Sequence, residues 1–292
     1  FAAALGFGLA IAAALVLEYL DDTVKTTEGI ERRLGVTGLG TIERVANVQR
    51  RGDALVTVRE PRSPVAEAYR VLRANLEFAL VSHPTRSLLV TSASRGEGKS
   101  TTAANLAVAL AMGGSRIVLV DTDLRRPSLH RIFGLTNSVG LTSLLLDESL
   151  AASDVMQQVT DVPGLRLVTS GPLPPNPAEL LKTVRTRKVL ERLGAEADLV
   201  ILDSPPLLVV VDGAILSTFA GATILVFECG VTRMEAARRA LSVLGKVGVV
   251  PIGTVVNKLD RTRVGGYYYD YAYRYGEYYR RDAGDGSAPT EG

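Results

Sequence analysis

The stretch 93–101, A-S-R-G-E-G-K-S-T, constrains the fold of this chain more than any other. The apolar run 87–91 before it is typical of a strand, and the Ala- and Leu-rich segment 102–112 after it is typical of a helix. A glycine turn in this setting points successive backbone N–H groups at phosphate oxygens, and the helix N-terminus adds partial positive charge. The stretch therefore has the form of a P-loop, with Ala93 in place of the usual first glycine.

Each residue type in a P-loop has a part in nucleotide binding. The lysine, Lys99, would reach the β- and γ-phosphates, and the hydroxyl of Ser100 would complete the coordination shell of Mg²⁺. We therefore expect this loop to hold a magnesium-bound nucleotide. The residues of the stretch expected to bind it are Arg95, Gly96, Glu97, Gly98, Lys99, Ser100 and Thr101.

Further apolar runs of strand length follow the P-loop and alternate with helical stretches. Such a pattern predicts an α/β fold, here a P-loop NTPase with a mostly parallel sheet and helices on both faces. The last helix is expected to open at a capping box, Thr232-x-x-Glu235, and to run to about Val247. The runs expected to form strands after the P-loop are 116–120, 165–169, 199–202, 223–227 and 251–256.

Acidic residues follow two of these strands, at the edge of the sheet where α/β proteins bind ligands. Asp203 comes after four apolar residues, as a Walker B carboxylate does, and would hold Mg²⁺ through water. Asp121 and Asp123 end another strand two residues apart, so both can approach the γ-phosphate. A phenol, with a pKa near 10, attacks phosphorus poorly unless a carboxylate accepts its proton, and either of these two could be that base.

The N-terminal segment predicts a membrane span. Residues 1–17 carry no charge, and 1–20 together approach the length of a spanning helix. The alternative is a buried core helix. Basic residues follow at Lys25, Arg32 and Arg33, which predicts that the rest of the chain faces the cytoplasm. Because the chain begins with Phe1 rather than Met, we expect a longer protein whose upstream part is missing.

Residues 21–62 are interpreted as a juxtamembrane linker with a short helix at 27–34. A new helix is expected from Ser63 to about Leu80, and this helix opens the predicted P-loop domain, 63–260. Within the helix Glu67, Arg70 and Arg73 are spaced by three and share one face. That face is either solvated and laced with ion pairs or a charged surface for self-association.

The end of the chain, 261–292, differs in composition from everything before it. Eight of the ten tyrosines lie there, with few aliphatic residues and a Gly-, Ser-, Pro- and Thr-containing end. Such a segment cannot form a core of its own and is predicted to be disordered. On composition alone it could also be a simple aromatic linker.

Global composition excludes several classes of protein. The formal net charge is +2, which gives no reason to expect a nucleic-acid partner. Cys229 is the single cysteine, so no internal disulfide can form. His83 and His130 are far apart in sequence, and no cluster of histidine and cysteine suggests zinc.

Taken together, these motifs resemble the bacterial tyrosine kinase (BY-kinase) family of the polysaccharide-synthesis type, in the form fused to a chain-length-determinant membrane region. Walker A and Walker B alone are common to many ATPases, whereas the other matches are specific. The matching parts are 93–100 as Walker A, 118–125 as Walker A′, 200–206 as Walker B, Glu67, Arg70 and Arg73 as the oligomerisation motif, and the C-terminal tyrosines as the autophosphorylation cluster.

The resemblance implies an ATP- and Mg²⁺-dependent protein-tyrosine autokinase. Its catalytic residues would be Lys99, Asp121, Asp123 and Asp203, with the metal held by Ser100, Asp123 and Asp203. Asp121 is the favoured base, although Asp121 and Asp123 could exchange roles. Members form rings in which one subunit's tail enters its neighbour's site. The tyrosines expected to be phosphorylated are Tyr267, Tyr268, Tyr269, Tyr271, Tyr273, Tyr275, Tyr278 and Tyr279.

The resemblance also implies a setting and partners. The protein would sit in the cell membrane with its kinase domain in the cytoplasm and would regulate capsular or exopolysaccharide synthesis and export. Its partners would be further copies of itself, a cognate tyrosine phosphatase, and proteins of polysaccharide polymerisation and export. No nucleic acid is expected.

Three alternatives are weighed against this interpretation. Partitioning-type ATPases carry a signature lysine where this chain has Ser94, which disfavours them. A GTPase is suggested by the N-K-x-D run 257–260, but Pro206 stands where its companion motif needs glycine, so Asn257 is expected to contact adenine. The third alternative is a membrane-anchored scaffold that binds nucleotide without transferring phosphate.

Overall fold

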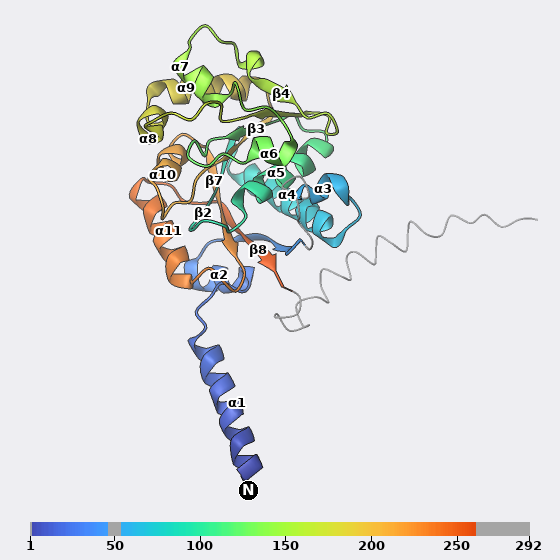
Figure 1. Ribbon diagram of the computed structural model, residues 1–292, viewed down its shortest axis with the longest axis vertical. Helices are drawn as coiled ribbons and strands as arrows, with labels where there is room; N and C mark the ends of the chain where they lie inside the picture. The colour runs from blue at the N-terminus through green and yellow to red at the C-terminus, as the bar shows by residue number, and fades with distance from the viewer. Residues whose placement is uncertain (1, 46–53, 261–292) are drawn as a thin grey trace, which may run out of the picture. The chain divides into compact units, whose positions relative to one another are not determined.

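The structure is a computed structural model that describes residues 2–45 and 54–260 (Figure 1). By internal contacts the chain divides into two units, Phe1–Leu259 and Asp260–Gly292. Apart from Asp260, the second unit lies outside the described residues, and so do the predicted tail and its tyrosines. The elements and the site described below all belong to the first unit.

An eight-stranded sheet forms the centre of this unit, with the strand order β1-β8-β7-β2-β6-β3-β5-β4. Neighbouring strands are parallel, except that β4 runs antiparallel to β5. The predicted α/β class with a mostly parallel sheet is therefore confirmed. The strands are β1 (Gly38–Glu43), β2 (Ser87–Ser92), β3 (Ile117–Asp121), β4 (Met156–Gln158), β5 (Leu165–Val168), β6 (Leu199–Asp203), β7 (Ala222–Glu228) and β8 (Gly253–Leu259).

Helices cover both faces of the sheet (Figure 1). Side chains alternate between faces along a strand: in β7, Ile224 and Val226 pack with α4 and α5, whereas Leu225 and Phe227 pack with α2 and α11. The helices are α1 (Ala2–Leu20), α2 (Thr27–Leu34), α3 (Val56–Arg59), α4 (Pro64–Ser82), α5 (Lys99–Met112), α6 (Leu129–Phe133), α7 (Leu141–Leu146), α8 (Pro177–Leu181), α9 (Val184–Ala195), α10 (Asp212–Ser217) and α11 (Met234–Lys246), with a 3₁₀ turn at Ala152–Asp154.

Helix α5 explains the Ala-rich sequence that follows the P-loop. Every residue from Thr102 to Ala111 is buried, so the helix is enclosed on all sides rather than on one stripe. Small side chains let it lie close to the sheet and to α4. The start of α5, which carries Lys99 and Ser100, is thereby fixed against the carboxyl ends of β2, β3 and β6.

The segment 21–62 differs from its interpretation as a linker. The predicted helix is present as α2, with the Thr26 hydroxyl accepting from the N–H of Gly29. Strand β1, however, extends the sheet by pairing with β8. It belongs there because Leu39 and Ile42 are buried in the core, and Gly253 leaves room for Leu39. The linker interpretation was wrong for this part of the chain.

The predicted membrane span falls on α1. Among the residues described, no helix is both long enough and apolar enough to cross a membrane. The span is therefore not confirmed.

Candidate active site

The P-loop requires glycine at its turn for two physical reasons. Gly96 and Gly98 have φ of 86° and 92°, in the left-handed region that side chains disfavour. A Cβ on Gly98 would also lie 1.9 Å from Nδ2 of Asn257. Ala93 does not need a glycine's conformational freedom, because its φ is not positive and its methyl group is buried in an apolar cluster with Leu207 and Phe227. The missing first glycine therefore costs this loop nothing in conformation.

Glu97 turns its carboxylate into the loop rather than toward a ligand. Its Oε2 accepts from the N–H of Ser94 at 2.6 Å, and its Oε1 accepts from the hydroxyl of Thr232. Burial raises the pKa of Glu97, and the hydrogen bonds from Ser94 and Thr232 oppose that rise. The side chain thus holds the loop closed and ties it to the turn before α11.

This use of Thr232 corrects a prediction. The expected capping box does not form, because α11 begins after Arg233 and has no side-chain cap. The Thr232 hydroxyl instead bridges Glu97 and the N–H of Glu228, from which it accepts at 2.9 Å. Glu235 forms an ion pair with Arg239 on the exposed side of the helix.

Two residues at the end of β8 orient the peptide groups of the P-loop. Asn257 Nδ2 donates to the carbonyl of Glu97 at 3.0 Å, and Lys258 Nζ donates to the carbonyl of Gly96. The C=O and N–H groups of a trans peptide point in opposite directions. These bonds therefore turn the N–H groups of Glu97 and Gly98 to the other side of the loop, as phosphate binding requires.

Lys99 lies among carboxylates. Its Nζ is 3.1 Å from Oδ2 of Asp123 and 3.6 Å from Oδ1 of Asp203, and it donates to the Ser100 hydroxyl at 3.1 Å. Burial acts to lower the pKa of Lys99, but the two carboxylates outweigh burial and the net shift is upward. The ammonium group is therefore charged, and it is the cation that compensates the acidic strand ends.

Asp203 is buried without enough partners for its charge. It lies at the end of β6 with no exposed surface, and neither carboxylate oxygen has a hydrogen-bond partner among the described residues. Burial raises its pKa, and Lys99 opposes the rise. A buried polar atom without a partner is costly. The two oxygens are thus suited to a metal or to water bound to one.

Asp121 stands directly opposite Asp203 in the register of β3 and β6. Its Oδ2 accepts from the N–H groups of Ser128 and Leu129, each at 2.9 Å, which fixes the carboxylate in place. Burial, followed by the charge of Asp203, raises the pKa of Asp121 to about 7. This value suits a group that accepts a proton near neutral pH.

The donor set fits magnesium shared with phosphate better than a metal held by protein alone. In the described part of the chain, no group of three His, Cys, Asp or Glu residues could hold a metal ion. Mg²⁺ usually keeps several waters and takes one or two carboxylates plus phosphate oxygens. Ser100 fits that pattern, and so do the oxygens of Asp203, which accept no hydrogen bond from the described residues. Asp123 contacts the same lysine, Lys99, and lies close to both.

Comparison with known proteins identifies the family. A family model described as "ParA: NUBPL iron-transfer P-loop NTPase" matches residues 83–262. The tyrosine-protein kinase YwqD of Bacillus subtilis is 43% identical over 216 residues, which cover 73% of this chain and 90% of YwqD. The chain belongs to the bacterial tyrosine kinase family. This confirms the predicted family and the predicted enzyme class, protein-tyrosine kinase.

Solved structures agree. The kinase domain of the Escherichia coli tyrosine kinase ETK matches with a TM-score of 0.77 and 29% identity, covering 85% of this chain and all (100%) of that domain. The putative tyrosine-protein kinase EpsB of Ralstonia nicotianae is 34% identical over 299 residues. That match covers 99% of this chain but only 39% of EpsB, so the chain spans well under half of this larger relative.

The structure brings part of the predicted site of this tyrosine kinase together. Lys99, Ser100, Asp121, Asp123 and Asp203 meet at the start of α5, and Asn257 contacts the same loop. Arg95 and Gly96, in the same loop, are exposed. The roles of these residues in binding and transfer stay predictions.

The predicted oligomerisation residues lie apart from this cluster, on α4. Glu67 and Arg70 form an ion pair with each other. Arg73 contacts its own chain: its guanidinium donates to the carbonyl of Ala109, near the end of α5, at 3.0 Å. A solvated face and a self-association surface both stay predictions for α4, although Arg73 is already engaged within its own chain.

Sequence reasoning missed several residues that shape the site. Lys258 and Thr232 position the P-loop, and Arg125 binds Asp212 through two bonds of 2.8 and 3.1 Å. The last pair joins the Walker A′ loop to α10. These residues lie in the Walker A′, N-K-x-D and capping-box patterns, but their partners are far away in sequence, so the patterns did not predict these contacts.

Proposed function

We propose that the chain transfers the γ-phosphoryl group of ATP, with Mg²⁺, to tyrosines in its own C-terminal segment. The observation that carries the proposal is the convergence of one partly buried lysine, Lys99, with three buried carboxylates at the ends of two neighbouring strands. A site that only binds nucleotide needs the P-loop and a Mg²⁺ ligand. It has no use for a second, fixed carboxylate whose pKa lies near 7.

The residues divide the work of transfer between them. Lys99 and the N–H groups of the P-loop bind and orient the phosphates. Ser100, Asp203 and Asp123 would hold Mg²⁺, which neutralises charge on the phosphates. Asp121 accepts the phenolic proton as the tyrosine oxygen attacks, since its carboxylate is held in place by the N–H groups of Ser128 and Leu129.

The decisive experiment is incubation of the full chain with radiolabelled ATP and Mg²⁺, followed by phosphoamino-acid analysis. Label in phosphotyrosine that disappears in Lys99→Met supports the kinase. Absence of label from a folded, nucleotide-binding protein supports the scaffold alternative. Tighter binding of GDP than of ADP would overturn the choice of ATP.

We further propose that transfer occurs between copies. A Lys99→Met chain keeps its tyrosines but should lack activity, whereas a chain with all eight tail tyrosines changed to Phe should keep activity but lack acceptors. Label on the Lys99→Met chain in a mixture of the two shows transfer in trans. Label that appears in neither chain contradicts it.

The proposal also covers how copies of the chain assemble. Rings of copies, formed through the α4 face, would disassemble as phosphate accumulates on the tails, since phosphotyrosine carries about −1.5 to −2 charges. Identical size distributions for phosphorylated protein and the Tyr→Phe tail variant would contradict this cycle.

We also propose, from the sequence and the family resemblance, a membrane-associated kinase with its catalytic domain in the cytoplasm. It would act in capsular or exopolysaccharide synthesis, beside export proteins and a tyrosine phosphatase, and cell fractionation tests its location.

A further inference from the structure

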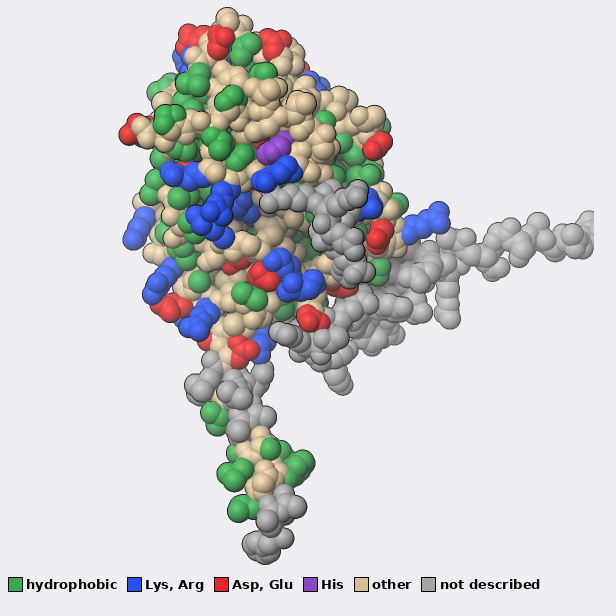
Figure 2. All heavy atoms as spheres, viewed as in Figure 1, with side chains coloured by type: hydrophobic (Ala, Val, Ile, Leu, Met, Phe, Trp, Pro, Cys, Tyr) green, Lys and Arg blue, Asp and Glu red, His purple; other side chains and the backbone are tan. Residues whose placement is uncertain are grey.

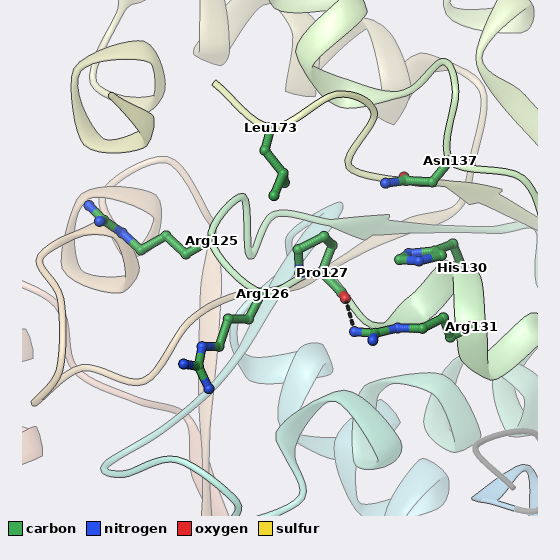
Figure 3. Close-up of a pocket in the computed structure, with 7 residues that line it drawn as sticks. All are labelled: Arg125, Arg126, Pro127, His130, Arg131, Asn137 and Leu173. Atoms are coloured by element: carbon green, nitrogen blue, oxygen red, sulfur yellow. Dashed lines mark hydrogen bonds between the residues drawn. The ribbon is translucent and has the colours of Figure 1, made fainter. Parts of the chain in front are cut away.

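A basic pocket opens beside the active site, on the loop that follows β3 (Figure 3). Its volume is about 550 Å³, and no acidic side chain of the described residues lines it. Figure 2 shows Lys and Arg side chains gathered near the middle of one face of the molecule, next to a histidine. The lining residues are Arg125, Arg126, Pro127, His130, Arg131, Asn137 and Leu173.

The three arginines of this pocket differ in how their charge is compensated. Arg125 is neutralised by Asp212, whose side chain is fully buried. Arg131 uses one nitrogen on the carbonyl of Pro127 at 2.6 Å and forms no ion pair with the described residues. Arg126 is exposed, and within the described ranges its guanidinium has neither an ion pair nor a hydrogen bond. Two guanidinium charges are therefore available to an anion.

The opposite wall of the pocket is apolar and already in place. Leu173 is 55% exposed, and in Figure 3 its side chain points toward Pro127. Asn137 fixes the loop before Leu173, because its Oδ1 accepts from the N–H of Gly171 at 3.0 Å and its Nδ2 donates to the carbonyl of the same residue at 3.2 Å. The pocket thus offers an apolar surface on one side and uncompensated positive charge on the other.

This combination selects for a ligand with an apolar ring and an anionic end. A pocket of this volume is within the range of small-molecule sites. Guanidinium groups bind phosphate through paired, charge-assisted hydrogen bonds. A nucleotide has its own site at the P-loop, where the phosphates meet Lys99. Phosphotyrosine joins a six-membered ring to a dianion and fits both walls.

We propose that this basic pocket, through Arg126 and Arg131, binds phosphotyrosine from the C-terminal segment of a copy of this chain. The inference rests on the proposed kinase function and deepens it. The backbone N–H of Arg126 donates to Asp123 Oδ1 at 3.0 Å, so the pocket adjoins the carboxylates of the site. Those carboxylates repel a newly formed phosphate dianion, while Arg126 and Arg131 attract it. The product moves along one loop and leaves the site free for the next tyrosine of the same tail.

The test is direct binding of a synthetic tail peptide, residues 265–281, with or without phosphate on Tyr269. The receptor is the full chain with its eight tail tyrosines changed to Phe, so that it carries no competing phosphotyrosine. We expect the phosphopeptide to bind at least about tenfold more tightly than the unphosphorylated peptide. Arg126→Gln should remove that advantage, and Arg238→Gln, an exposed arginine on α11, should leave it unchanged.

Several results would overturn the inference. One is a phosphate that adds no affinity. Another is an equal loss in Arg238→Gln and Arg126→Gln, which would indicate only general charge attraction. Inorganic phosphate that competes as well as phosphotyrosine would show that the apolar wall contributes nothing. Because no ATP is needed, these outcomes are independent of whether the protein transfers phosphate at all.

A second measurement uses the active chain with its natural tail. After incubation with ATP, intact mass spectrometry counts the phosphates on each tail. We expect Arg126→Gln to shift the distribution from multiply toward singly phosphorylated chains relative to Arg238→Gln. Matching distributions for the two variants would contradict retention of the product.

Discussion

The P-loop and the acidic edge formed by Asp121, Asp123 and Asp203 meet at Lys99, yet they differ in how well their polar groups are satisfied without a ligand. In the P-loop, bonds from Asn257, Lys258 and Thr232 fix the turn before any nucleotide arrives. At the acidic edge, burial leaves both oxygens of Asp203 without hydrogen-bond partners among the described residues. The P-loop is thus held ready for a ligand by hydrogen bonds, whereas at the acidic edge one cation, Lys99, compensates three buried carboxylates only in part.

This difference predicts how the two regions respond to mutation. Changes in the P-loop remove preorganisation, so they weaken nucleotide binding and destabilise the fold. At the acidic edge, replacing Asp121 removes a buried charge whose pKa is raised by burial and by Asp203, so it impairs transfer while stabilising the protein. Active sites commonly carry such a conflict between stability and function.

The largest expected effect is on transfer itself. Asp121→Asn removes the proposed base without changing shape, and we expect the rate of tyrosine phosphorylation to fall about 10²- to 10⁴-fold, the usual contribution of general-base catalysis. The dissociation constant for ADP should change only a few-fold, because Asp121 bonds to backbone of its own loop. Asp123→Asn is the matched comparison. Should it lose transfer while Asp121→Asn keeps it, the two aspartates have exchanged roles.

The same variant tests the cost of buried charge through pH. The pKa of Asp121 is raised from 3.8 to about 7 in the folded protein, so the folded state binds a proton that the unfolded state releases. The loss of folding stability caused by ionising the buried Asp121 is absent below pH 4 and grows as the pH rises to about 7. Without nucleotide, Asp121→Asn should therefore gain stability over wild type in that window, on the order of 2–4 kcal/mol at pH 8.

Denaturant unfolding at pH 4 and pH 8 measures this gain. Asp198→Asn serves as the control, since Asp198 is paired with Arg116 and its pKa is lowered. A stability difference for Asp121→Asn that does not change with pH would sink the claim that this carboxyl is strained by burial.

A glycine substitution tests whether the P-loop is fixed in its binding conformation without nucleotide. Gly98→Ala places a methyl group 1.9 Å from Asn257 Nδ2 at a φ of 92°. We expect a loss of about 1–3 kcal/mol in unfolding free energy and a large loss of nucleotide affinity, measured by denaturant unfolding and ADP titration. Gly245→Ala, in open space on α11, should instead stabilise slightly, by about 0.5–1 kcal/mol. Equal effects from both variants would mean that the contact with Asn257 has no special weight.

How far sequence alone reaches depends on the range of the interactions involved. The strand–turn–helix of the P-loop and the strand ends carrying Asp121 and Asp203 follow from local apolar patterns, and the structure has them where the patterns predict them. Strand β1 does not, because its place depends on Leu39 packing over Gly253, far along the chain. Thr232 has the pattern of a local helix cap, but its partner Glu97 is 135 residues away. Local rules fail where a distant side chain offers a better partner.

The smallest expected effect comes from removing a single hydrogen bond, the one between Asn257 at the end of β8 and the P-loop. Asn257→Ala removes the donor to the Glu97 carbonyl but leaves the glycines and Lys258 in place. One hydrogen bond of this kind is worth about 1 kcal/mol, so the dissociation constant for ADP should rise about fivefold. Asn257→Asp keeps the shape and loses the donor, and it should behave the same way or worse. If instead Asn257→Ala binds ADP normally and only the preference between adenine and guanine nucleotides changes, Asn257 reads the base and the loop is held by Lys258 and Glu97 alone.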